Sequence, residues 1–231
     1  MRKCKWVYGW MTVSMPAAAL AVLLGAATQS GPTQTQPAVA ATTAKAPAVA
    51  ATAPETAAAA NLEAGYISLF NGKDLTGWGY PNGQKFDGLT EVPGDDKRYN
   101  VVNGLLTVHA RTQQQRTLEL RTTQNFTGDF ILKLEFRAGV RADSGIFLRG
   151  HQLQCRDYST MGPYRNLTKY KPQDWNEIEI TVKGPTALCT CNGEVLEAAF
   201  TVPANGGIGL ESDGGIMEYR NIRLKPLPAD K

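Results

Sequence analysis

The sequence predicts an all-β fold, a jelly-roll β-sandwich of two antiparallel sheets, for residues 62–228. From residue 62 on, short alternating or apolar runs are separated by clusters of Gly, Asn, Asp and Pro, which is typical of strands joined by turns. No segment keeps a helical period for long. A length of about 170 residues fits one sandwich better than two domains.

Strands are expected wherever an apolar or alternating run is bounded by turn residues. In chain order they are Ile67–Phe70, Tyr99–Val102, Leu105–Val108, Thr117–Arg121, Phe130–Arg137, Gly145–Arg149, Gln152–Asp157, Trp175–Lys183, Ala187–Cys191, Glu194–Ala199, Ile208–Ser212 and Gly215–Pro226. Two connections, Asn103-Gly104 and Asn192-Gly193, are type I′ hairpin signals because both residues of each pair tolerate positive φ.

The strand expected at Phe130–Arg137 shows the alternation most clearly. Its even-numbered positions are apolar, while Lys133, Glu135 and Arg137 share the other side, as a half-buried antiparallel strand requires. One face of this strand therefore builds the core, and the other offers a charged surface. A turn at residues 142–145 is expected to lead into the next strand.

The first 28 residues are expected to be a signal peptide or an N-terminal membrane anchor. Basic residues at positions 2, 3 and 5 precede an apolar run, and small residues follow it. A run of about twenty mostly apolar residues is also long enough to span a membrane. Residues 29–61 are rich in Ala, Thr and Pro and carry few charges, so they predict a disordered linker. The protein is therefore expected to be exported.

The charge balance argues against nucleic-acid binding. The chain has 24 basic and 21 acidic residues, of which 4 basic and 1 acidic lie in residues 1–60. The remainder holds 20 of each and is formally neutral. A nucleic-acid binder needs a basic field to neutralise phosphates, and no cluster of Lys and Arg supplies one here.

Three cysteines follow the apolar run. Cys189 and Cys191 are two residues apart in an expected strand, so both project from one face and are not expected to bond each other. Cys155 with either could form a disulfide in an oxidising compartment, or all three could be buried small hydrophobic residues. A Cys-x-Cys pair alone is an incomplete set of zinc ligands.

Several planar hydrogen-bonding side chains lie close together in the sequence. Arg149 ends one expected strand, and Gln152, Gln154 and Asp157 follow on the next. The two glutamines share one face because they are two residues apart. Guanidinium, amide and carboxylate groups each make paired hydrogen bonds, which suits the neighbouring hydroxyls of a sugar. These residues indicate a carbohydrate site.

Eight segments carry more information together than their strand pattern does. In chain order they are GYISLFNGKDLTGW, YNVVNGLLTV, DFILKLEFR, ADSGIFLRG, QLQCRDY, QDWNEIEITVKG, NGEVLE and GGIGLESDGGIMEYRNIRLKPL. From residue 62 to residue 227 they resemble the bacterial exported 3-keto-disaccharide hydrolase domain family, formerly a domain of unknown function. The resemblance implies a concanavalin A-like lectin/glucanase fold, a location in the periplasm or at the cell surface, and a role in processing glycosides.

The activity that the resemblance implies is cleavage of 3-keto-disaccharides or other 3-keto-glycosides. A carbonyl at C3 acidifies the hydrogen on C2, so a base can remove that hydrogen and the group at C1 leaves by elimination. Water can then add back, which gives net hydrolysis. A separate sugar oxidoreductase is expected to supply the keto group, because the sequence has no Gly-rich dinucleotide fingerprint.

The residues expected to perform this chemistry come from the same stretch of sequence. Asp157 or Glu135 is the expected base, and His151 is either a second proton carrier or a surface histidine, since imidazole titrates near neutral pH. The side chains expected to bind substrate are those of Arg137, Arg149, Gln152, Gln154, Tyr158 and Tyr164. A divalent metal could replace the arginines as the electrophile, but no ligands with diagnostic spacing are visible, and no other cofactor is expected.

Gln152 departs from the family pattern. Many members have a glutamate at this position, and a neutral amide cannot accept a proton. If that glutamate is the base elsewhere in the family, this chain must use Asp157 or Glu135, or it has lost the activity. The long segment Ser159–Asp174 lacks periodicity, and because long loops are often functional, we expect it to border the ligand groove.

Simpler interpretations of the same residues remain. Glu135 and Arg137 can form only a solvated face, and Arg149 can pair with Asp157 or Asp143 in a structural salt bridge. The domain can then be a non-catalytic carbohydrate-binding module, or a structural domain of the cell envelope. Turnover of a 3-keto-disaccharide separates the first of these from the enzyme.

Overall fold

The computed structural model describes residues 62–94, 97–112 and 119–228. The signal or anchor expected at residues 1–28 and the linker expected at residues 29–61 lie outside the described residues. Within the described part of the chain, no helix is long and apolar enough to cross a membrane.

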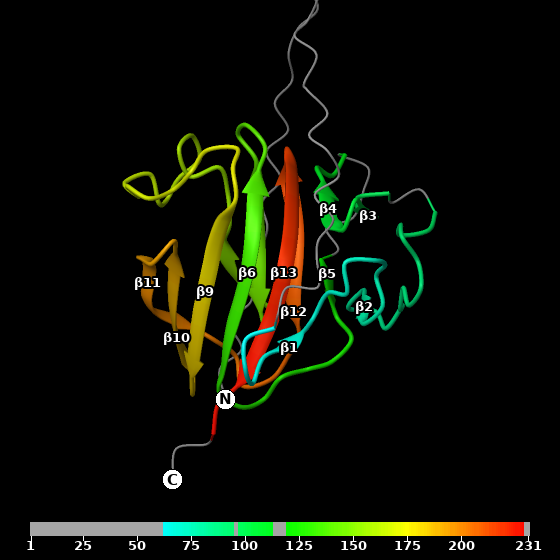
Figure 1. Ribbon diagram of the computed structural model, residues 1–231, viewed down its shortest axis with the longest axis horizontal. Coiled ribbons are helices and arrows are strands. Elements are labelled where there is room, and N and C mark those ends of the chain that lie inside the picture. Colours follow the sequence, from blue (N-terminus) through cyan, green and yellow to red (C-terminus); the bar gives the residue numbers. More distant parts are fainter. Residues whose placement is uncertain (1–61, 95–96, 113–118, 229–231) are drawn as a thin grey trace, which may run out of the picture. The chain divides into compact units, whose positions relative to one another are not determined.

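The described residues form two antiparallel sheets (Figure 1). The larger sheet contains β1 (Ile67–Ser68), β3 (Tyr99–Val102), β4 (Leu105–His109), β6 (Phe130–Ala138), β9 (Asn176–Lys183), β10 (Thr186–Cys191), β11 (Glu194–Thr201) and β13 (Ile216–Pro226). Its order is β11-β10-β9-β6-β13-β4-β3, with β1 paired to β13. The smaller sheet contains β2 (Trp78–Gly79), β5 (Leu120–Thr122), β7 (Asp143–Leu148), β8 (His151–Gln154) and β12 (Ile208–Gly214). Its order is β2-β5-β12-β7-β8.

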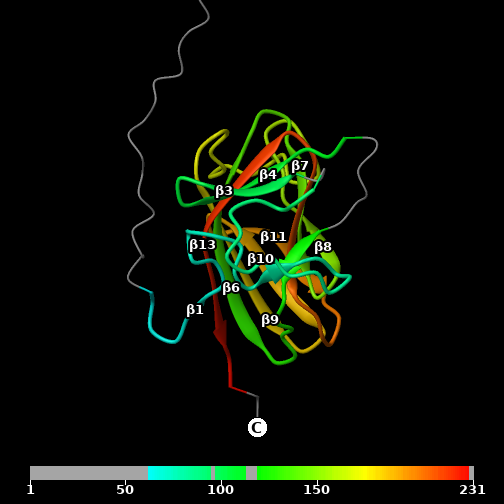
Figure 2. The ribbon, with the colours of Figure 1, turned by 90° about the vertical axis from the view of Figure 1, so that its right-hand side faces the viewer.

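The sheets pack face to face because each has one apolar face. On β6, buried residues alternate strictly with half-buried ones, so the predicted alternation is confirmed. β13 and β8, one strand from each sheet, lie on opposite sides of the view in Figure 2. The largest fully buried side chains include Trp78, Tyr99, Tyr158, Tyr219, Phe86, Phe130 and Phe136. The predicted all-β sandwich of two antiparallel sheets is confirmed.

Every strand expected from the sequence overlaps an observed strand. The start of the strand expected at Thr117–Arg121 lies outside the described residues. β2 was not predicted, because a strand of two residues shows no period. The turn expected at residues 142–145 is wrong: β7 already begins at Asp143, and the chain reverses at residues 139–142. Arg141 takes the left-handed conformation there, with φ of 57°.

Both predicted type I′ hairpins are confirmed. Asn103 and Gly104 have φ of 52° and 81°, and Asn192 and Gly193 have φ of 48° and 79°. These turns join β3 to β4 and β10 to β11, each pair being antiparallel. Positive φ at both central residues matches the twist of the flanking strands, which fixes the register of each hairpin.

All three cysteines are free and buried, which agrees with their interpretation as small hydrophobic residues. Burial first, with a smaller contribution from a nearby glutamate in each case, raises the pKa of Cys189 and of Cys191 to about 12. Such thiols remain protonated at neutral pH and are poor nucleophiles.

Candidate functional site

The predicted base Glu135 and the predicted donor Arg137 lie on the outer face of the larger sheet. Both belong to β6, whose alternate residues are buried in the core. The Glu135 carboxylate accepts hydrogen bonds from Arg220 Nε and Asn221 Nδ2, each at 2.7 Å. Arg137 Nε donates to Glu218 at 2.6 Å. Opposite charges are therefore matched on this face, which agrees with the simpler interpretation of these two residues.

The predicted base Asp157 is fully buried, and hydrogen-bond donors surround its carboxylate. Oδ1 accepts from Ser159 at 2.6 Å and Tyr170 at 3.3 Å, and Oδ2 accepts from the Thr160 hydroxyl at 2.8 Å and the Arg141 amide at 2.9 Å. Burial by itself raises the pKa of Asp157, but the hydrogen bonds from Ser159, Arg141 and Thr160 outweigh it and lower that pKa. A carboxylate stabilised in this way is a weak base, and it organises the loop around it.

Arg149 lies in the turn between β7 and β8, with φ of 55° and a buried side chain. Its guanidinium donates to two backbone carbonyls, one of them that of Pro203 at 3.0 Å. In the described ranges, the alternative of a salt bridge from Arg149 to Asp157 or Asp143 is not observed, and Asp143 pairs with Arg156 at 2.6 Å instead. Arg149 therefore ties the turn to neighbouring loops.

Three other predicted residues make packing contacts. His151 is exposed, and its Nδ1 lies 2.7 Å from the backbone oxygen of Thr201. Tyr158 is buried and donates to a backbone carbonyl of β8 at 2.8 Å. Tyr164 is half-buried and donates to Glu197 of β11 at 2.7 Å. Each contact holds a loop or a strand edge in place.

The segment Ser159–Asp174 contains no helix or strand, as its lack of periodicity predicted. Tyr164 in this segment contacts β11 through Glu197. The backbone amides of Thr168 and Lys169 donate to the carboxylate of Glu194, a second residue of β11. The loop therefore packs along β11. The border that we expected it to form with a ligand groove stays a prediction.

Gln152 and Gln154 lie on the outer face of the smaller sheet. Their predicted common face is confirmed, because Leu153 between them is buried in the core. Gln152 Nε2 donates to Glu211 Oε1 at 2.7 Å. In the described ranges, Gln154 Oε1 is buried and has no hydrogen-bond partner, so it is an acceptor that a ligand can satisfy.

The predicted site residues therefore do not share one surface. Glu135 and Arg137 face outward from the larger sheet, whereas Gln152 and Gln154 face outward from the smaller one. Alternation along a strand fixes which side chains leave the core, but it does not fix the sheet to which the strand belongs.

Glu211 of β12 is the central acid on the outer face of the smaller sheet and was not among the predicted residues. Its side chain points out of the sheet because the preceding Leu210 is buried in the core. It is nevertheless only 4% exposed. A carboxylate within an apolar strand, two residues after a glycine on the same face, is the sequence signal that marks it.

Glu119, which precedes β5, also lies on this face, and two glycines make room for the polar side chains. A Cβ at Gly145 would lie 2.2 Å from Gln152 Nε2, and a Cβ at Gly209 would lie 3.1 Å from Glu119 Cδ. The side chains of Gln152 and Glu119 therefore lie across the bare backbone of β7 and β12. Together Glu119, Arg121, Gln152, Gln154 and Glu211 form what we call the Glu211 site.

Burial and neighbouring carboxylates favour the protonated form of Glu211. Burial, and then the carboxylates of Asp213 and Glu119, raise the pKa of Glu211 to about 7, while Arg98 and Arg111 act in the opposite direction. Arg111 Nε also pairs with Asp213 at 2.6 Å. A carboxyl group with this pKa is populated in both forms at neutral pH, so it can accept or donate a proton.

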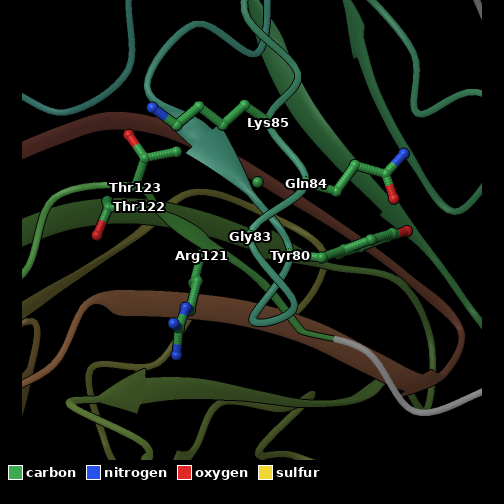
Figure 3. Close-up of a pocket in the computed structure, with 8 residues that line it drawn as sticks. Tyr80, Gly83, Gln84, Lys85, Arg121, Thr122 and Thr123 are labelled. Carbon is green, nitrogen blue, oxygen red and sulfur yellow. The ribbon is translucent and has the colours of Figure 1, made fainter.

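A cavity of about 90 Å³ lies at β2 and β5, beside this site (Figure 3). It is lined by Gly79, Tyr80, Gly83, Gln84, Lys85, Arg121, Thr122 and Thr123. Arg121 is the cross-strand partner of Gly79 on one side and of Gly209 on the other. The cavity therefore adjoins the Glu211 site at Arg121.

Proton transfer and hydrogen bonding are the chemistry that the Glu211 site can supply. Two carboxyl groups, two amides and a guanidinium face the same side of the smaller sheet. Across the described ranges, no three His, Cys, Asp or Glu side chains gather in a way that could hold a metal ion.

These features define a β-sandwich of two antiparallel sheets with a cluster of acids and amides on the outer face of the smaller sheet. Residues 65–225 match the family described as the 3-keto-alpha-glucoside-1,2-lyase-like domain, and the chain belongs to that family. The family resemblance carried by the sequence segments is thereby confirmed. No curated protein matches the chain.

Solved structures resemble the chain at low sequence identity. A protein of Parabacteroides distasonis ATCC 8503, named provisionally as a glycosyl hydrolase, has a TM-score of 0.53 and 18% identity over 71% of this chain and 94% of its own. A second such protein of that organism has a TM-score of 0.49 and 16% identity over 70% of this chain and 99% of its own. The Bacillus subtilis carbohydrate-binding module CBM66 has a TM-score of 0.42 and 12% identity over 69% of this chain and 99% of its own. The first of these similarities supports the two-sheet fold.

Proposed function

We propose that this domain cleaves 3-keto-glycosides, including 3-keto-disaccharides, with Glu211 as the base. The observation that carries the proposal is a carboxyl group only 4% exposed, held by Gln152 at 2.7 Å, with its pKa raised to about 7. Membership of the 3-keto-alpha-glucoside-1,2-lyase-like family supports the substrate class. Glu211 takes the role that we expected of Asp157 or Glu135.

The reaction needs one base and one acid. Glu211 as carboxylate removes the hydrogen on C2, and the negative charge passes to the oxygen at C3. The electron pair then forms a double bond between C1 and C2 as the bond from C1 to the glycosidic oxygen breaks. That oxygen takes a proton and departs as an alcohol, and addition of water to the unsaturated sugar gives net hydrolysis.

The neighbouring side chains suit these steps. Gln152 fixes the orientation of Glu211, because its amide donates to the carboxylate oxygen Oε1. Gln154 presents an unsatisfied oxygen to a sugar hydroxyl. Arg98 and Arg111, whose charges act on Glu211, are cations suited to stabilise a developing enolate oxygen.

The test is turnover of a 3-keto-disaccharide by the Glu211→Gln variant. The amide keeps the shape of the side chain but cannot accept the C2 proton, so kcat should fall by about 10² to 10⁴-fold. Glu179→Gln, which changes an acid paired with Lys133 at 3.3 Å on the larger sheet, is the control and should retain its rate. Full turnover by Glu211→Gln would exclude Glu211 as the base.

A non-catalytic carbohydrate-binding module is the second candidate. The amides of Gln152 and Gln154 favour it, since hydrogen bonds to sugar hydroxyls require no proton transfer. Saturable binding of a 3-keto-disaccharide by calorimetry, without release of either sugar, would support this candidate over the enzyme.

Export to the periplasm or cell surface, and dependence on a separate sugar oxidoreductase, belong to the same proposal. The basic and apolar start of the sequence supports export. Cell fractionation tests the location, and recovery in the cytoplasm would contradict it. The oxidoreductase is needed because the elimination begins from a sugar already oxidised at C3.

A further inference from the structure

Strand register places a second acid beside Glu211. β5 and β12 are antiparallel, with Gly209 opposite Arg121 and Leu210 opposite Leu120. One more step in the same register brings Glu119 opposite Glu211. Both acids face outward because the two leucines are buried. Directly opposed residues on neighbouring strands have Cβ atoms about 5 Å apart.

The carboxyl group of Glu119 lies against the sheet. Its Cδ is 3.1 Å, and its Oε2 3.3 Å, from where a Cβ would stand at Gly209. Gly209 and Arg121 are cross-strand partners, so this carboxyl group lies toward the Arg121 side of Glu211. Gln152 holds Glu211 from the β8 side. Glu119 and Glu211 therefore lie on the two sides of one strip of the outer surface of the smaller sheet.

Their charges are coupled. Burial raises the pKa of Glu119, against the opposing effect of Arg121, and the Glu119 charge is one of the influences that raise the pKa of Glu211. Two carboxyl groups in this relation lose their protons in succession, so one proton is shared between them over an intermediate pH range. Because the pKa of Glu211 is the more strongly raised of the two, the proton lies mainly on Glu211, and the reactive form is the less populated one, in which Glu119 holds the proton and Glu211 is the carboxylate.

We propose that Glu119 is the acid that protonates the departing glycosidic oxygen, an assignment that rests on the proposed function above. Glu211 takes the proton from C2, and Glu119 gives its proton to the oxygen as the bond from C1 breaks. Glu211 ends protonated and Glu119 ionised, and return of one proton between them through solvent resets the pair. The cavity bordered by Arg121 and Lys85 gives the leaving group a place on the Glu119 side (Figure 3).

The decisive measurement varies the leaving group. 4-Nitrophenol leaves without protonation, whereas methanol or a second sugar needs an acid. With the methyl 3-keto-glucoside and a 3-keto-disaccharide, Glu119→Gln should lower kcat by about 10² to 10⁴-fold. With the 4-nitrophenyl 3-keto-glucoside, it should lower kcat by less than about threefold. Glu211→Gln should slow all three substrates, because each needs removal of the C2 proton.

The outcomes separate this inference from the proposed function. Equal loss on all three substrates, or no loss on any, overturns Glu119 as the acid. If the loss in Glu119→Gln depends on the leaving group while Glu211→Gln keeps full turnover, Glu119 is retained as the acid and Glu211 is overturned as the base. Saturable binding without turnover by the unchanged protein overturns both. Glu179→Gln on the larger sheet is the control and should match the unchanged protein on every substrate.

A second variant guards against misfolding of Glu119→Gln. Gly209→Ala introduces a Cβ at 3.1 Å from Glu119 Cδ, and also at 3.1 Å from Phe147 Cβ on β7, so it displaces the carboxyl group without removing it and presses on β7 as well. It should show the same dependence on the leaving group, with a smaller loss. A uniform loss across the three substrates in the folded Gly209→Ala protein counts against the acid role.

Discussion

The outer faces of the two sheets carry similar residue types in opposite arrangements. On the larger sheet, acidic side chains lie next to basic ones. For example, the Glu135 carboxylate accepts a hydrogen bond from Arg220 Nε at 2.7 Å. On the smaller sheet, Glu119 and Glu211 oppose each other across β5 and β12, with their pKa values raised. A candidate functional site is therefore marked by acids placed next to acids, and not by the number of charges.

The largest stability effect should come from Asp157, an acid surrounded by donors. Asp157→Asn replaces one carboxylate oxygen by an amide nitrogen, which leaves the Ser159 or Thr160 hydroxyl without an acceptor on this buried side chain. We expect a loss of about 3 kcal/mol in the free energy of unfolding, measured by urea denaturation. The folded fraction should keep its turnover, because the weak base Asp157 is not part of the Glu211 site.

The opposite result for Asp157 would break the comparison. Loss of turnover in Asp157→Asn with an unchanged unfolding curve would restore Asp157 as the base. Asp174→Asn is a suitable control, because Asp174 is exposed in the same loop and, among the described residues, its carboxylate accepts only the neighbouring Trp175 amide, at 2.7 Å.

The next effect is a pH dependence of stability that belongs to Glu211. Its pKa is raised from 4.5 to about 7 in the folded protein, so the folded state binds more protons than the unfolded state between these values. The contribution is fully present below about pH 4.5 and is lost as the pH rises through about 7. We expect the free energy of unfolding to fall by about 2 kcal/mol across this range.

Urea denaturation of Glu211→Gln at pH 5 and pH 8 measures that contribution. The amide does not titrate, so the variant should lose most of this slope and be the more stable protein at pH 8. Glu135→Gln, on the larger sheet, should keep the slope of the unchanged protein. An unchanged slope in Glu211→Gln would show that the acids of the smaller sheet are not coupled as described.

The fold was predictable because strands and hairpins are local. Alternation on β6 and the Asn-Gly turns can be read from neighbouring residues, and both are confirmed. The Glu211 site was not predictable in this way. Gln152 and Glu211 are 59 residues apart and meet only through the pairing of β8 with β7 and of β7 with β12. The sequence identified Gln152 as a polar, outward-facing residue, but it did not identify its partner Glu211.

Gly145→Ala should have a moderate effect on activity. Its Cβ would lie 2.2 Å from Gln152 Nε2, so the amide must move away from Glu211. We expect kcat to fall about tenfold through loss of one hydrogen bond to a charged group. Gly128→Ala, where a Cβ meets nothing within 4 Å, is the matched control and should keep its rate. Equal rates in both variants would show that Gln152 does not position Glu211.

The smallest effect should come from the ion pairs of the larger sheet. A double-mutant cycle on Glu135→Gln and Arg220→Gln should give a coupling free energy below about 1 kcal/mol in urea denaturation, because both side chains are partly solvated. Turnover of a 3-keto-disaccharide should stay within about twofold in all three variants. Loss of turnover in Glu135→Gln would move the base to the larger sheet and reverse the comparison between the two faces. A small coupling with full turnover would show that the matched charges of the larger sheet contribute little to stability and nothing to turnover.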